Sequence, residues 1–229
     1  MEKAISFLGR DSGFGRKNTA AYAIVDNRLL LIDSGQTVMT ELQNRSLLDP
    51  NLITGIDVII THLHGDHAGS LSQLALWCYF VLKSPINIIS ACENIDTLMT
   101  ITGAAENDQI PGFPEVRYTR INDFVNFIKT EHVGHELDCY GFSTTINDTP
   151  VVYTGDTTTI EPFLPFLGVG TQFYIDASIN GGVHLKLEPN LPKLIELTQS
   201  SVAVYLMHLD NEQKIRDLIA GTAIKICDD

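Results

Sequence analysis

Residues 61–69 of this 229-residue chain read Thr-His-Leu-His-Gly-Asp-His-Ala-Gly, and no other segment constrains the fold as strongly. They follow a largely apolar run, Asp57-Val-Ile-Ile, that has the composition of a buried strand. Imidazole nitrogens and carboxylate oxygens suit Zn²⁺ and similar cations, and residues 62–67 hold three histidines and an aspartate. The segment therefore predicts a metal-binding turn, because a loop that was merely rich in histidine would have no reason to gather four donors around a glycine.

The spacing of these donors predicts two neighbouring ions. His62 and His64 are two residues apart, so in an extended segment their side chains lie on the same side and can bind one ion together. Asp66 and His67 follow Gly65, where the chain can turn, and they are placed to bind a second ion. Residues 69–82 lack strand alternation and are apolar nearly all round, which predicts a buried helix.

The segment resembles the His-x-His-x-Asp-His signature of the metallo-β-lactamase fold superfamily. This resemblance implies three further metal ligands, which are matched by His135, Asp156 and His208. His132 competes for the mid-chain position. We prefer His135 because Tyr140-Gly141-Phe142 follows it at the family's distance, which leaves His132 beside the ligands or on the surface.

The resemblance covers nearly the whole chain, and it implies one hydrolase domain over residues 1–229. The expected fold class is α/β, a metallo-β-lactamase-type αβ/βα four-layer sandwich whose two halves are related. Apolar runs predict strands near 4–8, 20–25, 28–33, 56–61, 86–90, 123–131, 140–146, 150–155, 172–176, 202–207 and 223–226. Helices are predicted near 37–47, 69–82, 92–101, 160–167, 190–199 and 211–220, and the polar, Gly- and Pro-containing segment 101–114 is expected to be a mobile wall of the cleft.

Later motifs separate the branches of the superfamily. β-Lactamases of this fold that use two zinc ions usually have a cysteine where this chain has Asp156, and they carry export signals, so antibiotic hydrolysis is not expected. The opening Phe7-Leu-Gly-Arg-Asp-Ser-Gly and the stretch Asp176-Ala-Ser before His184 resemble ribonuclease Z and its small phosphodiesterase relatives. That resemblance implies that His184 is a catalytic acid oriented by Asp176; the alternative is a solvent-facing loop histidine.

The substrate is expected to be small and anionic. Ribonuclease Z enzymes that mature tRNA insert a long arm between the mid-chain ligand and the bridging aspartate, and the residues between His135 and Asp156 suffice for only one hairpin. The formal net charge is −13, and no basic cluster larger than Arg16-Lys17 occurs, so we expect no binding of long nucleic acid.

The expected mechanism is a two-metal hydrolysis. His62, His64 and His135 would bind one ion and Asp66, His67 and His208 the other, with Asp156 bridging ions roughly 3.5–4 Å apart. A hydroxide that bridges the metals would attack a small phosphodiester or cyclic phosphate, and His184, held by Asp176, would protonate the leaving oxygen. The ions are expected to be zinc, with manganese or iron as alternatives. A lactone, thioester or carboxyl-ester hydrolase, or a non-catalytic metal protein, remains an alternative function.

The rest of the chain predicts a cytoplasmic protein that forms a homodimer. No signal peptide precedes the first predicted strand, and no apolar run is long enough to span a bilayer. The four scattered cysteines do not suggest disulfides, although Cys139 lies near the expected metal loop. The 69–82 helix has more apolar surface than one face requires, which favours a two-fold dimer over a helix covered by the 101–114 loop.

Overall fold

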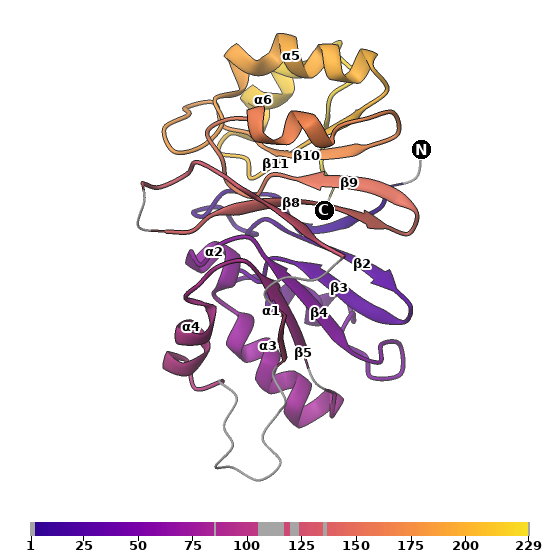
Figure 1. The fold of residues 1–229 in the computed structure, drawn as a ribbon, viewed down its shortest axis with the longest axis vertical. Helices are drawn as coiled ribbons and strands as arrows, with labels where there is room; N and C mark the ends of the chain where they lie inside the picture. Colours follow the sequence, from indigo (N-terminus) through magenta and orange to yellow (C-terminus); the bar gives the residue numbers. More distant parts are fainter. Residues whose placement is uncertain (1–2, 85, 105–116, 120–123, 135–136, 229) are drawn as a thin grey trace.

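The molecule is a sandwich of two six-stranded sheets with helices on both outer faces (Figure 1). The computed structural model describes residues 3–84, 86–104, 117–119, 124–134 and 137–228. The four-layer α/β arrangement confirms the fold class that the sequence predicted. In the described part of the chain, no helix has both the length and the apolar character needed to cross a membrane.

The first sheet holds the N-terminal strands in the order β1-β2-β3-β4-β5-β6. Its first three strands pair antiparallel, and from β3 onward the pairing is parallel. The strands are β1 (Ser6–Gly9), β2 (Ala20–Val25), β3 (Arg28–Ile32), β4 (Ile56–Ile60), β5 (Ile86–Ser90) and β6 (Arg117–Thr119). Its outer face packs on α1 (Val38–Asn44), α3 (Leu71–Trp77) and α4 (Ile95–Ile101).

The second sheet repeats this plan in the order β7-β8-β9-β10-β11-β12. Again the first three strands pair antiparallel and the later ones parallel. The strands are β7 (Asn126–Lys129), β8 (Tyr140–Ile146), β9 (Thr149–Tyr153), β10 (Gln172–Asp176), β11 (Ala203–Met207) and β12 (Lys225–Ile226). Its outer face carries α5 (Leu187–Gln199), α6 (Glu212–Ile219) and the 3₁₀ helix η2 (Glu161–Phe166).

Alternate residues of each strand serve two different cores. In β4, Val58 packs with the helices of the first half, whereas Ile59 packs between the sheets. In β10, Phe173 faces the helices of the second half and Tyr174 faces the other sheet. This alternation follows from the two-residue repeat of a strand, and it lets one short strand stabilise two layers.

Three elements differ from the sequence prediction. The single helix expected at 69–82 is divided into α3 and the π-helix η1 (Cys78–Leu82), and the separate short helix α2 (Gly65–Ala68) precedes it. The helix expected at 160–167 is the 3₁₀ helix η2, which contains two prolines. Strand β6 was not predicted, and most of the 101–114 loop lies outside the described residues.

Candidate metal centre

The candidate site lies where the carboxyl ends of strands from both sheets meet. His62 follows β4, Asp156 follows β9, Asp176 ends β10 and His208 follows β11. Side chains at the carboxyl ends of parallel strands share one edge of a sheet, which is the usual location of ligands in open α/β sheets. His208 takes a left-handed backbone conformation with φ 55°, which is uncommon outside glycine and occurs often at functional sites.

Three histidines form the first donor group. His62 Nε2 lies 3.1 Å from His64 Nδ1, and His132 Nε2 lies 3.4 Å from the same atom. Ligands of one tetrahedral zinc ion with bonds of about 2.05 Å lie roughly 3.3 Å apart, so these three nitrogens converge as ligands of one ion would.

His132 supplies the third nitrogen of this group, and its side chain is only 2% exposed. His132 Nδ1 is 2.7 Å from the carbonyl oxygen of Val183, which fixes the orientation of the ring. His135, the residue favoured by the family spacing, lies outside the described residues. The geometry therefore points to His132, the residue that the sequence analysis ranked second.

The second donor group joins Asp66, His67, Asp156 and His208. His67 Nε2 is 3.4 Å from Asp66 Oδ2 and 3.3 Å from Asp156 Oδ1. His208 Nε2 is 3.3 Å from Asp66 Oδ2 and 3.6 Å from Asp156 Oδ2. The four residues come from α2 and from the ends of β9 and β11, so this group spans both halves of the molecule.

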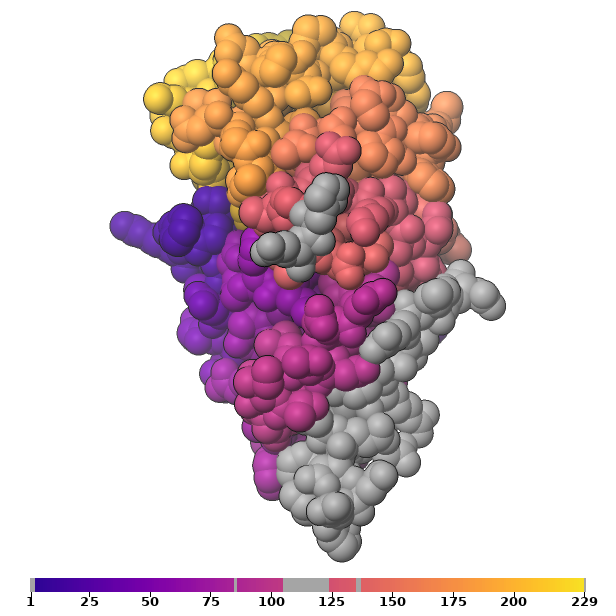
Figure 2. Space-filling view, turned by 60° about the vertical axis from the view of Figure 1, so that its left-hand side comes forward, coloured from indigo at the N-terminus to yellow at the C-terminus, as the bar shows by residue number. Residues whose placement is uncertain are grey.

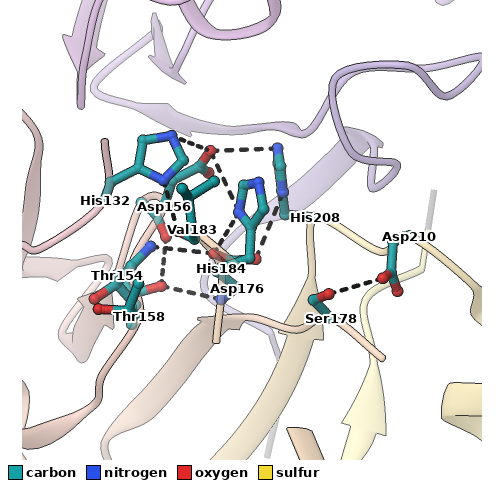
Figure 3. A network of polar contacts seen from close by, with 12 residues as sticks. His132, Thr154, Asp156, Thr158, Asp176, Ser178, Val183, His184, His208 and Asp210 are labelled. Carbon is teal, nitrogen blue, oxygen red and sulfur yellow. Dashed lines mark hydrogen bonds and ion pairs between the residues drawn. The ribbon is translucent and has the colours of Figure 1, made fainter. Parts of the chain in front are cut away.

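Asp156 connects the two groups. Its Oδ2 lies 3.5 Å from His132 Nε2 and 3.8 Å from His62 Nε2, while its Oδ1 faces His67. Because Oδ2 also lies 3.6 Å from His208 Nε2, this oxygen lies near members of both groups, and the carboxylate stands between the groups as a bridging ligand would. Figure 3 shows His132, His184 and His208 gathered around this carboxylate.

The buried atoms of these groups fit a bound cation. Within the described part of the chain, His67 Nε2 and Asp156 Oδ1 are buried without a hydrogen-bond partner. Polar atoms buried in this way are unfavourable unless something satisfies them, and a cation between them would do so. A donor set of imidazole and carboxylate groups suits a divalent transition metal.

The protonation states agree with this fit. Burial lowers the pKa of His62 well below its usual value and lowers that of His64 too, so both keep a lone pair for a metal. Burial also acts to lower the pKa of His208, but nearby carboxylates, Asp156 first, outweigh it and raise the value to about 10. The same balance raises the pKa of His67 well above its usual value. A proton on each of these two rings therefore compensates the buried carboxylates, and a divalent cation would take the place of those protons.

Asp33 supports the second group and was missed by the sequence analysis. Its Oδ2 accepts from His67 Nδ1 at 2.9 Å, and its Oδ1 accepts from the backbone N–H of Thr61 at 2.9 Å. Carboxylates that hold a metal-binding histidine in this way fix its tautomer and ring orientation. The sequence offered one signal, an acidic residue directly after the strand at 28–32.

His184 stands beside the two groups and is held by Asp176. Its Nδ1 lies 2.9 Å from Asp176 Oδ2, and the other carboxylate oxygen lies 3.5 Å from His208 Nδ1. Burial acts to lower the pKa of His184, but the hydrogen bond to Asp176 and the negative charges of Asp176 and Asp156 together outweigh burial and raise the pKa. The pairing expected from the sequence is therefore present, and His184 lies beside the Asp156 carboxylate as well (Figure 3).

A pocket of about 640 Å³ opens onto these residues. His64, Asp66, His184 and His208 line it, together with Phe14 of the loop after β1. This volume lies within the usual range for small-molecule sites, roughly 300–1,000 Å³.

Comparisons with known proteins agree with the fold and identify the family. The family model described as Anti-Pycsar protein Apyc1 matches residues 3–223. An Anti-Pycsar protein Apyc1 of Bacillus phage 010DV004 is 28% identical over 232 residues, which covers 89% of this chain and 88% of that protein.

Among solved structures, the metallo-β-lactamase fold protein YhfI of Bacillus subtilis superposes with a TM-score of 0.70 at 16% identity, covering 97% of this chain and 94% of that one. The short form of human tRNase Z superposes with a TM-score of 0.65 at 18% identity over 91% of this chain and 93% of that one. The fold is thus that of the metallo-β-lactamase superfamily, and the chain belongs to the Anti-Pycsar protein Apyc1 family.

Proposed function

We propose that this protein is a metal-dependent hydrolase that opens a small cyclic phosphodiester, with a cyclic nucleotide as the substrate class. The observation that carries the proposal is the pair of donor groups that share Asp156. The family name adds the substrate class, because an anti-Pycsar protein suggests a function in degrading cyclic nucleotides.

His62, His64 and His132 would hold one divalent ion, and Asp66, His67 and His208 the other, with Asp156 between them. When bound, such a pair stabilises charge on phosphoryl oxygens and lowers the pKa of water toward ~7, which provides a nucleophile at neutral pH. Zinc fits the histidine-rich donor set, and manganese or iron would fit it too.

The residues beside the metals supply the proton for the leaving group. Water adds its oxygen to phosphorus while one ester P–O bond of the ring breaks. The leaving alkoxide takes a proton from His184 Nε2, and Asp176 keeps the ring oriented through Nδ1. The product is a linear phosphate monoester in which the original sugar and phosphate remain joined.

Charge and pocket size favour a small anion over a long nucleic acid. Two divalent ions would bring four positive charges, more than the two negative charges of the carboxylates that would contact them, Asp66 and Asp156, whereas Asp33 and Asp176 face His67 and His184. The ions would therefore attract a phosphate despite the net charge of −13. A pocket of about 640 Å³ suits one nucleotide.

The test compares metal content with activity on several ester classes. Protein loaded with zinc or manganese should bind about two ions per chain, measured by elemental analysis, and should convert 3′,5′-cyclic nucleotides to monophosphates. His64→Ala should lose metal and turnover, while Lys193→Ala on the exposed side of α5 should match the wild type. Failure to take up either metal would overturn the proposal. Cleavage confined to lactones, thioesters or carboxyl esters would instead establish the alternative hydrolase function.

A further inference from the structure

Phe14 is a fully exposed aromatic residue beside the metal centre. Its relative exposure is 106%, and its side chain lines the same pocket as Asp66, His184 and His208. Leaving a phenylalanine side chain in water forgoes roughly 1.5–3 kcal/mol of burial free energy, so its position at the mouth of a polar site calls for a reason.

Backbone hydrogen bonds hold the loop that carries Phe14. Asp11 N–H donates to the Lys17 carbonyl at 3.0 Å and closes the base of the loop. Ser12 N–H donates to the carbonyl of Leu209, the residue after His208, at 3.1 Å. At the tip, Gly15 N–H donates to the Ser12 carbonyl at 2.8 Å, which closes a tight turn with Phe14 at one of its two central positions. The ring is therefore presented from a defined turn that is attached to the site.

The glycines on either side of Phe14 let this turn lie directly against its neighbours. A Cβ at Gly13 would lie 2.7 Å from Asp66 Oδ2, and a Cβ at Gly15 would lie 2.1 Å from Asp11 Cβ. A side chain at either position would thus push the turn away from the site or break its base. Figure 2 shows that part of the indigo N-terminal region projects from the surface at the left-hand edge of the molecule.

We infer that Phe14 stacks on the nucleobase of the substrate, an inference that rests on the proposed function. The phosphate ester would be held at the metal centre, and the base would then lie toward the pocket mouth, where the turn presents the exposed Phe14 ring. Stacking uses the flat face that every nucleobase has, so it gives affinity with little preference for one base.

The experiment uses two substrates that differ only in the base. One is a 3′,5′-cyclic nucleotide, and the other is the methyl riboside 3′,5′-cyclic phosphate, which has the same ester ring and no base. Phe14→Ala should raise KM for the cyclic nucleotide about 5-fold or more, leave kcat nearly unchanged and leave the baseless substrate unaffected. Phe14→Trp should retain the wild-type KM. Val169→Ala, which truncates another exposed apolar side chain outside this pocket, serves as the matched control.

Two results would overturn the inference while leaving the proposed function intact. These are an unchanged KM for the cyclic nucleotide in Phe14→Ala, or an equal rise in KM for both substrates. Wild-type protein that takes up metal and cleaves neither cyclic phosphate would refute the proposed function, and the stacking role with it.

Discussion

Asp33 is not among the residues that line the pocket, yet it is placed to control the proposed metal centre through His67. It is fully buried, adopts a left-handed backbone conformation with φ 62°, and fixes His67 and Thr61 at once. Asp33→Asn should lower metal affinity about 10- to 100-fold, because the amide cannot accept from both neighbours with its single oxygen. Competition with a chelator measures this effect. Asp57→Asn, at the Arg28 ion pair, is the control, and equal affinities in both variants would contradict the role.

The proposed role of His184 predicts a dependence on the leaving group. His184→Ala should lower kcat by about 10²–10⁴ for a cyclic nucleotide, whose alkoxide needs a proton to leave. The same variant should lose far less activity on bis(p-nitrophenyl) phosphate, because nitrophenolate leaves without one. Steady-state kcat values of the wild type and the variant on both substrates measure this difference. An equal loss of kcat on both substrates would show that His184 does not act as the proton donor to the leaving group.

Among individual residues, the sequence could predict the metal-donor side chains that lie close together along the chain. His62, His64, Asp66 and His67 lie within one turn, so their proximity is a property of the chain itself. His132 and Asp33 belong to the site through contacts between distant segments, and no spacing rule reports such contacts.

Two neighbouring strands of the second sheet carry a matched pair of tyrosines on the face toward the first sheet. Within the described residues, the Tyr153 hydroxyl of β9 is buried with no hydrogen-bond partner, whereas that of Tyr174 in β10 donates to Gln172 Oε1 at 2.6 Å. Tyr153→Phe should raise the free energy of unfolding by about 1 kcal/mol, and Tyr174→Phe should lower it by about 1 kcal/mol. Urea denaturation at equal metal content measures both changes. A loss in both variants would show that the Tyr153 hydroxyl is satisfied, for instance by water.

The division of the 69–82 segment changes where an interface between two copies is expected. Trp77 packs against the core, so its substitution would test folding more than association. Phe80 and Val81 of η1 are 59% and 51% exposed, and we propose them as the centre of a two-fold dimer. Phe80→Glu should convert a dimer to a monomer in sedimentation velocity at micromolar concentration, while Val169→Glu should not. A wild-type protein that sediments as a monomer would rule out this dimer.

Among the helices and strands, those formed by short runs of mostly apolar residues could be predicted from the sequence. Strands β2, β4, β10 and β11 are short, continuous and apolar, and the sequence placed them within a residue or two. The π-helix after Trp77 and the 3₁₀ helix at 161–166 depend on local backbone geometry, which the apolar pattern does not encode.

For the whole molecule, the second sheet leaves little chain for a tRNA-binding arm. Strands β8 and β9 are joined by the two-residue turn Asn147-Asp148, with φ 46° and 62°. With this short hairpin and a net charge of −13, we expect no 3′ processing of a precursor tRNA at physiological salt. A gel assay on a precursor tRNA, with a cyclic nucleotide as the positive control, tests this. Efficient cleavage of the tRNA would contradict it.

The arrangement of the two halves could be predicted from the resemblance to the metallo-β-lactamase superfamily, but not from the periodicity of apolar residues. Apolar runs predicted strands and helices, but they did not say which strands share a sheet or that one plan occurs twice. The pairing of the two halves depends on the packing of Ile59, Tyr174 and their neighbours between the sheets. This packing forms only when both halves are present.

The distribution of the site along the chain has a consequence for synthesis in the cell. Asp66 and His208 meet in the folded protein although they are 142 residues apart. A ribosome makes the chain from its N-terminus at about 5–20 residues per second, so the histidine-rich segment waits roughly 7–30 seconds before its last partner is made. During that interval the nascent chain can hold a metal only through an incomplete set of donors. The complete donor set for the two proposed ions therefore exists only once His208 has been made, and a shortage of metal would impair the proposed site after translation rather than during it.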